Sequence, residues 1–517
     1  MVTFFTFTAV LLMIFSPVLL AVLLRRRADV HWHIFLLGAL TFTESQVVHL
    51  PLNHFLEEWG VMVQQAGLEG VDLWRTALVG GLTAGVCEEL ARFGAYQLMK
   101  KRGIENGVML GIGHGGIESM VFGAVLTAAT VGTLSDLQGI DRGTLDLLPA
   151  QLEVLEMQME AFLNYPWTLI FAWLERMIAL GLHISLSVLV WKAVVEKKPV
   201  LVGLAVAYHM AVDTVVILVS NSDLIHWQSN LVFLLISLPL YFWALRQWRK
   251  LRSAAPARGG QAFLPAFLAA CRKELLEQVR SRRFLIVISV FAGFGILSPL
   301  FARFMPELIG SIEEAREFAH LIPEPAAADS YTQYIKNLSQ FGFILVLLMG
   351  MGSVAGEQER GTAAMILSKP MPRWLFVFSK LLIQMLVYSV SLFIALIFTF
   401  GYTWLLFGPQ EVGPFLLINL LLYLWMVTFA GITLVGSTLG NTTAAAAGFG
   451  MAGMVLLLVL GGVPMIGQLA PGGLIAWANQ LAVGEEITTN GGAAAMAGVL
   501  IVLSMLGSIA AMERKEI

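Results

Sequence analysis

Residues 166–191, PWTLIFAWLERMIALGLHISLSVLVW, form an apolar run of 26 residues that holds only three ionisable side chains, Glu175, Arg176 and His183. At about 1.5 Å per helical residue, such a run is longer than the roughly 30 Å hydrocarbon core of a bilayer. Comparable runs recur along the chain and predict thirteen membrane-spanning helices. They lie at residues 2–24, 33–56, 71–99, 106–134, 166–191, 199–220, 229–246, 284–304, 337–355, 380–407, 414–439, 443–466 and 491–512.

The composition excludes a water-soluble protein. Of the 517 residues, 57% are hydrophobic and 13% are charged, whereas an average soluble domain has about 45–50% apolar and about 25% charged residues. No alternating pattern typical of a membrane β-barrel is present. The net charge of −3 gives no indication of nucleic-acid binding. We therefore expect an all-α polytopic membrane protein that carries about seven plus six transmembrane helices in two bundles.

Basic residues indicate the orientation of the chain. Of the 32 Lys and Arg residues, 25 fall in alternate loops. The positive-inside rule then places the N-terminus outside and the C-terminus in the cytosol. The first span ends at Arg25–Arg27, has no basic segment before it, and is predicted to be retained and not cleaved as a signal peptide. We expect a multi-pass protein of a prokaryotic plasma membrane.

A small-residue stretch, Ser253–Gly260, separates two membrane units. We predict a first domain at residues 1–250, a cytosolic linker at 251–261 and a second domain at 262–517. The second domain begins with an amphipathic pattern typical of a helix on the membrane surface. Its apolar stripe consists of Leu264, Leu268, Cys271, Leu275 and Val279.

Four spans of the first domain carry ionisable residues at a similar depth. Glu88, His114, His183 and His209 lie 9 to 12 residues from the nearest cytosolic basic residue, which corresponds to roughly 14–18 Å along a helix. Charged groups inside a membrane are costly and mark functional sites by default. We expect these residues to form one intramembrane layer, whereas His49 and His54 are expected to be interfacial.

Spacing along each helix suggests how these groups pair. Glu88 and Arg92 stand at i, i+4, so we expect the arginine to hold one glutamate and to leave Glu89 or Glu88 free to activate water. The same spacing predicts that Asp213 fixes the tautomer of His209 and that Glu118 does so for His114. The small residues Gly111, Gly113, Gly115 and Gly116 give the fourth span a face that another helix can approach closely.

These motifs resemble a known family. Glu-Glu-x-x-Arg at 88–92, Gly-His-Gly-Gly-Ile-Glu-Ser at 113–119 and His-x-x-x-Asp at 209–213 are similar to the YhfC family of intramembrane proteases. That family is itself similar to the CAAX-prenyl-protease and bacteriocin-processing superfamily. Arg92 comes one position earlier than in the wider superfamily, and Leu110 replaces an expected Phe. These differences leave open which glutamate is the base.

The resemblance implies a set of roles. A glutamate of the Glu88–Glu89 pair and His114 would activate a water molecule, while His209 and Asp213 would stabilise the oxyanion. The supporting residues would be Arg92, Glu118, Glu175, Arg176 and His183.

Two mechanisms stay open. A divalent metal such as zinc is one possibility, with His114, His183, His209 and Glu89 as ligands. No His-Glu-x-x-His motif is present, and a glutamate with a histidine suffices for general-base chemistry, so we favour the metal-free mechanism. A purely structural polar network and an ion pathway are the other interpretations of this layer.

The second domain resembles the permease subunit of type-2 ABC exporters. The surface helix before its first span corresponds to the elbow helix of that family, and a charged, Pro-containing loop at residues 356–373 follows its second span. The resemblance implies that this loop contacts a nucleotide-binding subunit through Glu357, Glu359, Arg360 and Arg373. No Gly-x-x-x-x-Gly-Lys-Ser/Thr motif is present, so we expect ATP to act only through a separate ABC ATPase.

These interpretations predict an intramembrane endopeptidase fused to an ABC exporter permease. The expected substrate is a membrane peptide or lipoprotein-like molecule, and six spans per permease unit suggest a homodimer. In one alternative, the chain is an ABC-type transporter whose N-terminal unit is a non-catalytic receptor or immunity module. In another, the second domain is a passive scaffold for the protease.

Overall fold

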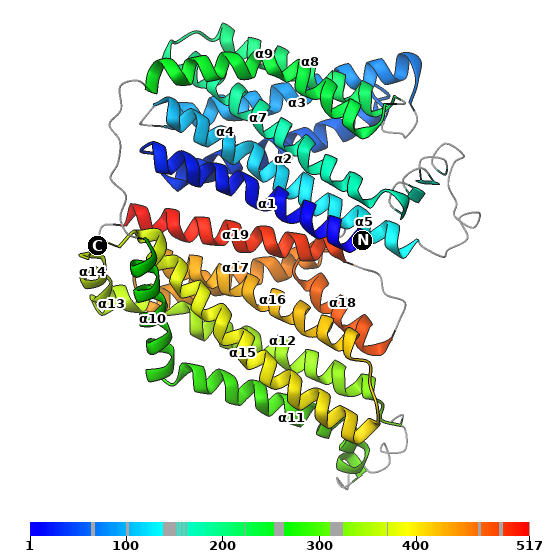
Figure 1. Cartoon of the computed structure of the whole chain (residues 1–517), viewed down its shortest axis with the longest axis vertical. Helices are drawn as coiled ribbons and strands as arrows, with labels where there is room; N and C mark the ends of the chain where they lie inside the picture. Colours follow the sequence, from blue (N-terminus) through cyan, green and yellow to red (C-terminus); the bar gives the residue numbers. More distant parts are fainter. Residues whose placement is uncertain are drawn as a thin grey trace. The chain divides into compact units, whose positions relative to one another are not determined.

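The computed structural model describes residues 1–63, 68–99, 103–137, 163–222, 224–252, 263–310, 324–369, 371–463, 467–484 and 490–515, together with single positions between 152 and 160 (Figure 1). The chain divides into two compact units, Met1–Gly259 and Gly260–Ile517. Every regular element of the described residues is a helix, which confirms the predicted all-α class. Most of the predicted linker 251–261 lies outside the described residues.

The first unit is a bundle in which each of the seven predicted spans falls on a long helix or a chain of joined helices (Figure 1). Its elements are α1 (Val2–Arg27), α2 (Trp32–Glu58), α3 (Gly70–Leu98), α4 (Ile104–Glu118), the π-helical segment η1 (Ser119–Val125), α5 (Leu126–Asp136), the short 3₁₀ turn η3 (Pro166–Thr168), α7 (Leu169–Val195), α8 (Val200–Ser220) and α9 (His226–Arg252).

The second unit contains six long helices at the positions of the remaining predicted spans, with short helices between them. Its elements are α10 (Phe263–Arg280), α11 (Arg283–Gly310), α12 (Ala327–Met351), α13 (Ala355–Glu359), α14 (Thr362–Leu367), α15 (Arg373–Phe407), α16 (Val412–Leu439), α17 (Thr443–Gly461), α18 (Gly472–Val483) and α19 (Gly491–Arg514).

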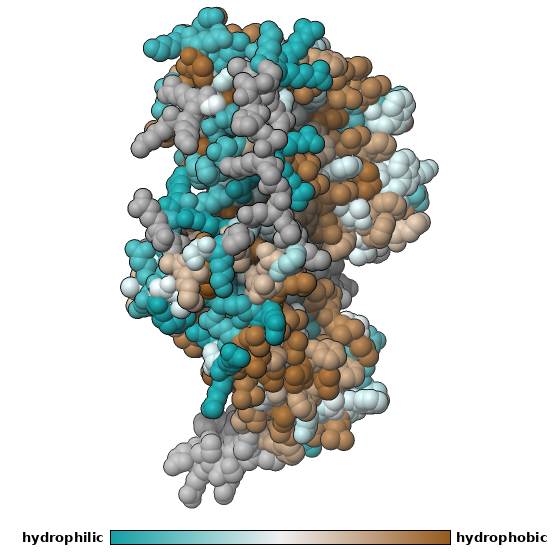
Figure 2. Space-filling view, turned by 60° about the vertical axis from the view of Figure 1, so that its left-hand side comes forward, coloured by the Kyte–Doolittle hydropathy of each residue, from teal (hydrophilic) through white to brown (hydrophobic). Residues whose placement is uncertain are grey.

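Eleven helices of the described residues are long and apolar enough to cross a membrane. The other two predicted spans fall on α2 and α3, which are as long but carry more polar residues, including Glu44, Glu88 and Arg92. Apolar residues cover much of the flank of each unit, and hydrophilic residues gather on one side of it (Figure 2). The protein is therefore a polytopic membrane protein, while the orientation of its termini stays a prediction.

The predicted surface helix is α10, and its apolar stripe faces outward. Leu268, Leu275 and Val279 are exposed, whereas Glu274 and Gln278 are buried. An apolar face turned away from the bundle suits a helix that lies against lipid headgroups and acyl chains.

Glycines bring the helices of the site into close contact. A Cβ atom on Gly113 of α4 would lie 2.0 Å from the carbonyl oxygen of Phe35 on α2. A Cβ on Gly81 of α3 would lie 2.6 Å from the carbonyl oxygen of Met210 on α8. Only glycine allows backbones to approach so closely. The predicted small face of α4 is thus confirmed, and α3 has a similar face toward α8.

Candidate functional site

Two buried glutamates on α3 share one arginine. The side chain of Arg92 is fully buried, and its Nη2 atom lies 3.4 Å from Oε2 of Glu88. Its Nη1 atom donates to Oε1 of Glu89. The expectation that one glutamate would be free of the arginine is wrong, because the i, i+3 and i, i+4 positions both lie within reach of one guanidinium.

Three imidazoles from three further helices surround Oε2 of Glu88. Nε2 of His114 on α4 lies 2.9 Å from this oxygen. Nδ1 of His183 on α7 lies 3.8 Å from it, and Nε2 of His209 on α8 lies 3.9 Å from it. All three histidines and the glutamate are buried. The predicted common layer of these four residues is confirmed.

The second ring nitrogen of each histidine, which faces away from Glu88, contacts a further polar side chain. Nδ1 of His209 lies 2.8 Å from Oε1 of Glu89, and Nδ1 of His114 lies 2.9 Å from Oγ1 of Thr41. Nε2 of His183 contacts Oε2 of Glu118. A neutral imidazole has one N–H, so an outer nitrogen that donates to a carboxylate leaves the inner nitrogen with its lone pair. The inner nitrogen of His183 accepts a hydrogen bond from Arg92, so it carries its lone pair. The inner nitrogen of His209 lies between the carboxylates of Glu88 and Asp213.

The partner of Glu118 differs from the prediction. This residue contacts His183 and not His114, and it also accepts from Nη1 of Arg176 at 2.9 Å. Glu118 is the last residue of α4, directly before the π-helical segment, where the residues no longer follow the regular α-helical spacing. Arg176 also pairs with Glu175, so the two predicted supporting residues of α7 form an outer charge pair around the site.

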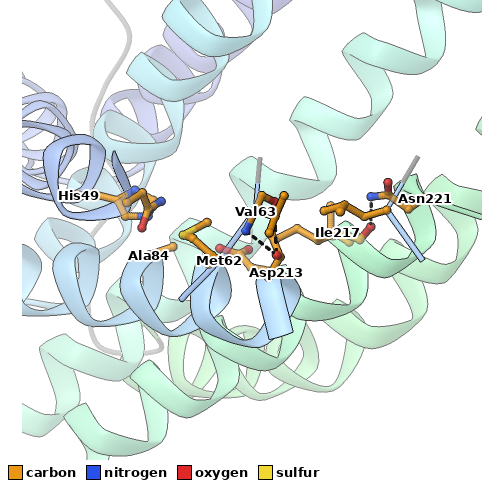
Figure 3. A pocket seen from close by; sticks show the side chains of 12 residues that line it. His49, Met62, Val63, Ala84, Asp213, Ile217 and Asn221 are labelled. Carbon is orange, nitrogen blue, oxygen red and sulfur yellow. Dashed lines mark hydrogen bonds between the residues drawn. The ribbon is translucent and has the colours of Figure 1, made fainter. Parts of the chain in front are cut away.

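Asp213 lies at the edge of the site. Its Oδ2 atom is 3.5 Å from the inner Nε2 atom of His209, and its side chain is 32% exposed. Glu89, and not Asp213, holds the outer nitrogen of this histidine. Asp213 also lines a cavity of about 390 Å³ together with residues of α2, α3 and α8 (Figure 3). It is thus the site residue that connects the buried histidines to open space.

Polar residues of α2 also contribute to the site, which was not predicted. Gln46 donates to Oε1 of Glu88 at 3.4 Å, and its amide oxygen lies 3.3 Å from Nδ1 of His49. Asn53 donates to Nε2 of His49 at 2.9 Å, so His49 belongs to a polar network that reaches Glu88, while its interfacial position stays a prediction. In the sequence, a polar residue at every fourth position of α2 indicates this polar face. This stripe consists of Thr41, Ser45, His49 and Asn53.

Buried carboxylates and imidazoles of the site have the chemistry of a metal centre. One oxygen of Glu88 and one nitrogen each of His183 and His209 all lie within 4.8 Å of one another. Two imidazoles and a carboxylate are a ligand set that zinc takes in catalytic sites, and carboxylates behind ligating imidazoles are typical of such sites. Arg92 also donates to Nδ1 of His183, so a metal at this nitrogen would displace the guanidinium.

The predicted ATPase-contacting residues of the second unit have different surroundings. Glu357 is buried and pairs with Lys273 of α10 and with Lys380 of α15. Glu359 accepts from the backbone of Thr443 at 3.0 Å. Arg360 is exposed over 55% of its side chain and lies 3.7 Å from Glu277.

The fourth predicted contact, Arg373, also binds within the chain. Its Nη1 atom donates to the carbonyl oxygens of Met512, Glu513 and Lys515 at 2.7 to 3.2 Å. Among the four predicted contacts, Glu359 and Arg360 are exposed, and Arg360 carries the exposed positive charge.

Ion pairs join helix α10 to the loop at residues 356–373. Burial alone would lower the pKa of Lys273, but the carboxylates of Glu274 and Glu357 raise it above its ordinary value. Glu274 also lies 2.9 Å from Lys380, which is almost completely buried. α10, α13 and α15 therefore meet at one buried set of charges.

Two family models match the chain. Residues 11–232 match the YhfC intramembrane metalloprotease family, and residues 268–485 match the ABC-2 family transporter proteins. The first match contains all the site residues from Glu88 to Asp213, and the second contains the loop at residues 356–373. The predicted combination of two families is confirmed.

Two proteins from Bacillus subtilis (strain 168) are each similar to a part of the chain. The uncharacterized transmembrane protein YxlG is 28% identical over 194 residues, which are 36% of this chain and 73% of YxlG. The uncharacterized membrane protein YhfC is 24% identical over 248 residues, which are 45% of this chain and 91% of YhfC. No solved structure matches. Together with the apolar helices, these findings confirm the plasma membrane location.

Proposed function

Because the chain joins a YhfC-family intramembrane metalloprotease domain to an ABC-2 transporter domain, we propose that the first unit cleaves peptide bonds within the membrane. The second unit then moves a related molecule with energy from a separate ATPase. One observation carries the first part of this proposal: three histidines from three helices direct one nitrogen each toward the same oxygen of Glu88. A network that only joined helices would not need three inward-facing imidazoles around one carboxylate.

Glu88, His183 and His209 are the proposed holders of a divalent metal. Their donor atoms cluster, and Glu89 and Glu118 orient the two imidazoles from behind. When bound, a zinc ion would supply Lewis-acid chemistry to the carbonyl of the scissile bond. The description of the family as metalloproteases favours this mechanism over the metal-free one expected from the sequence.

His114 is the proposed proton-handling group. Its Nε2 atom lies 2.9 Å from Oε2 of Glu88, beside the proposed metal ligands. With a metal on Oε2 of Glu88, this nitrogen can take a proton from the attacking water and return it to the leaving amine. Thr41 fixes the orientation of the His114 ring through its other nitrogen. In the metal-free alternative, His209 and Asp213 stabilise the oxyanion, and Arg92 provides positive charge at the centre.

Comparison of cleavage products in cells tests the first part of the proposal. New peptide termini of membrane proteins are measured by mass spectrometry in cells that express the wild-type chain or the Glu88→Gln variant. Glu44→Gln is the control, because Glu44 is an exposed carboxylate on α2. We expect termini that occur with wild type and Glu44→Gln and are absent with Glu88→Gln. Identical profiles for all three, at equal expression, would contradict a protease and favour the receptor or immunity module.

The second unit is the proposed docking site of the ATPase. The surface of α13 and α14 offers Arg360 and the 65% exposed side chain of Met365, and the buried charges beneath it join this surface to α10 and α15. A partner that moves α13 would therefore also act on the helices of the bundle. A homodimer stays a prediction.

A further inference from the structure

A cavity of about 390 Å³ lies between α2, α3 and α8 and opens beside Asp213 (Figure 3). Its volume is in the lower part of the range of about 300–1,000 Å³ found for ligand pockets. Most of its wall is apolar. The apolar side chains that define it are Met62, Val63, Leu68, Ala84, Val216 and Ile217.

The polar residues of the cavity lead to the candidate active site by two routes. On α8, Asp213 lies 3.5 Å from Nε2 of His209. On α2, His49 lines the cavity and is joined to Glu88 through Gln46, by contacts of 3.3 and 3.4 Å. A molecule in the cavity would therefore lie next to the groups that we propose to carry out hydrolysis.

Two neighbouring glycines of α3 show that the cavity is kept open on this wall. A Cβ atom on Gly81 would lie 2.6 Å from the carbonyl oxygen of Met210, so this glycine is required by helix packing. A Cβ on Gly80, which lines the cavity, would meet only Cδ1 of Ile217, at the ordinary contact distance of 3.4 Å. Helix packing does not require glycine at position 80. The absence of a side chain at position 80 leaves this part of the cavity open.

We propose that this cavity receives a bulky apolar side chain of the substrate, from a residue beside the bond that is cleaved. This inference rests on the proposed peptidase function and names its substrate class: a peptide segment with a leucine-, methionine- or phenylalanine-like residue next to the cleavage site. The apolar wall accommodates the side chain. Asp213, on the wall of the cavity, can accept a hydrogen bond from the peptide backbone of the same residue.

Photo-cross-linking tests binding separately from cleavage. The full chain in lipid nanodiscs, in its Glu88→Gln form, is incubated with a short leucine–alanine peptide that contains a photoreactive leucine. We expect adducts on cavity residues such as Ile217 and Met62. Introduction of Gly80→Leu should lower their yield about tenfold, since the added side chain fills the space that one substrate side chain needs.

Gly94→Leu is the matched control, because it makes the same change on the same helix at an exposed position where a Cβ meets nothing within 4 Å. Gly80→Ala adds only a Cβ atom, which the structure tolerates, and should lower the adduct yield by a smaller factor. This variant keeps the proposal testable if the leucine variant does not fold. Adducts outside the cavity, or adducts that Gly80→Leu does not reduce, would overturn the proposal. Equal labelling of the cavity by a photoreactive lipid, used in place of the peptide, would also overturn the proposal.

Cleavage assays distinguish the failure of the two proposals. If the wild-type chain cleaves nothing but the peptide still labels the cavity, the peptidase function fails and the pocket for an apolar side chain stands. If the wild type cleaves peptides and Gly80→Leu leaves the preference for the residue beside the bond unchanged, the peptidase stands and the pocket is refuted. We expect Gly80→Leu to shift cleavage toward alanine or glycine at that position.

Discussion

Nδ1 of His209 lies 2.8 Å from Oε1 of Glu89, while the other nitrogen of the same ring faces Glu88. The two adjacent glutamates of α3 therefore lie on opposite sides of one imidazole. Glu89 orients the ring, and Glu88 belongs to the group of donors at the centre. This relationship assigns different roles to two residues that the sequence left equivalent.

Replacement of Glu89 is expected to weaken metal binding without removing a ligand. The Glu89→Ala variant should bind zinc about 10–100-fold more weakly, because the imidazole of His209 loses the carboxylate that fixes its orientation. Zinc titration of the purified full chain in nanodiscs measures this change. An affinity equal to that of the wild type would contradict the role of Glu89, and Glu44→Gln is the control for a lost carboxylate.

His114 is expected to affect cleavage and not metal content. The His114→Asn variant should hydrolyse substrate about 10²–10⁴-fold more slowly, because the imidazole that takes the proton of the attacking water is lost. Its zinc content should match that of the wild type. Loss of zinc together with activity would instead make His114 a metal ligand, as the sequence had suggested.

Arg92 is expected to be important for stability. The Arg92→Met variant leaves two buried carboxylates without their positive partner, which costs about 3–5 kcal/mol for a buried pair. Thermal unfolding of the full chain measures the loss. Arg75→Met removes an exposed arginine that pairs with Asp72, and should cost less than about 1 kcal/mol. Equal losses of stability for the two substitutions would contradict the stabilising role of the buried ion pairs.

The contacts of α10 predict a pH dependence. Burial alone would raise the pKa of Glu277, but Lys273 lowers it below the ordinary value of 4.5. The ionised carboxylate therefore stabilises the fold at neutral pH, and this contribution is lost as the pH falls below 4.5 through the folded-state value. Between neutral and acidic pH, the unfolding temperature of the wild type should fall more than that of Glu277→Gln. Parallel curves would contradict the prediction.

Arg360 is expected to bind the ATPase. Reversal of its charge in the Arg360→Glu variant should reduce co-purification of the ATPase subunit, because this guanidinium is the exposed positive charge among the four predicted contacts. Lys336→Glu is the control, since it reverses an exposed charge on a different element, helix α12. Undiminished co-purification with Arg360→Glu would place the ATPase elsewhere.

The long apolar runs and the common depth of the site residues could be predicted from the sequence. Helix length follows from the number of apolar residues, and depth follows from counting along a helix. The rotation of each helix about its axis could not be predicted, since it depends on contacts such as Gly113 against Phe35. For this reason the sequence paired Glu118 with His114, whereas the structure pairs it with His183.

In the second unit, too, the sequence did not predict which charged residues contact each other. Glu357 was assigned to a loop that contacts a partner, but it is buried and forms an ion pair with the buried Lys380. A charge in a sequence indicates a polar environment, and only the fold shows whether water or an opposite charge provides it. By contrast, the histidine, threonine and asparagine at every fourth position of α2 carried a readable signal for a polar face.

Metal analysis of the purified full chain tests the central claim most directly. Zinc per chain is measured by mass spectrometry for the wild type, for the His183→Ala, His209→Ala double variant, and for a His54→Ala control. His54 is an exposed histidine outside the site. We predict bound zinc in the wild type and the control, and its loss in the double variant. Equal zinc content in all three, or its absence in all three after zinc is supplied, would contradict a metal centre at Glu88, His183 and His209.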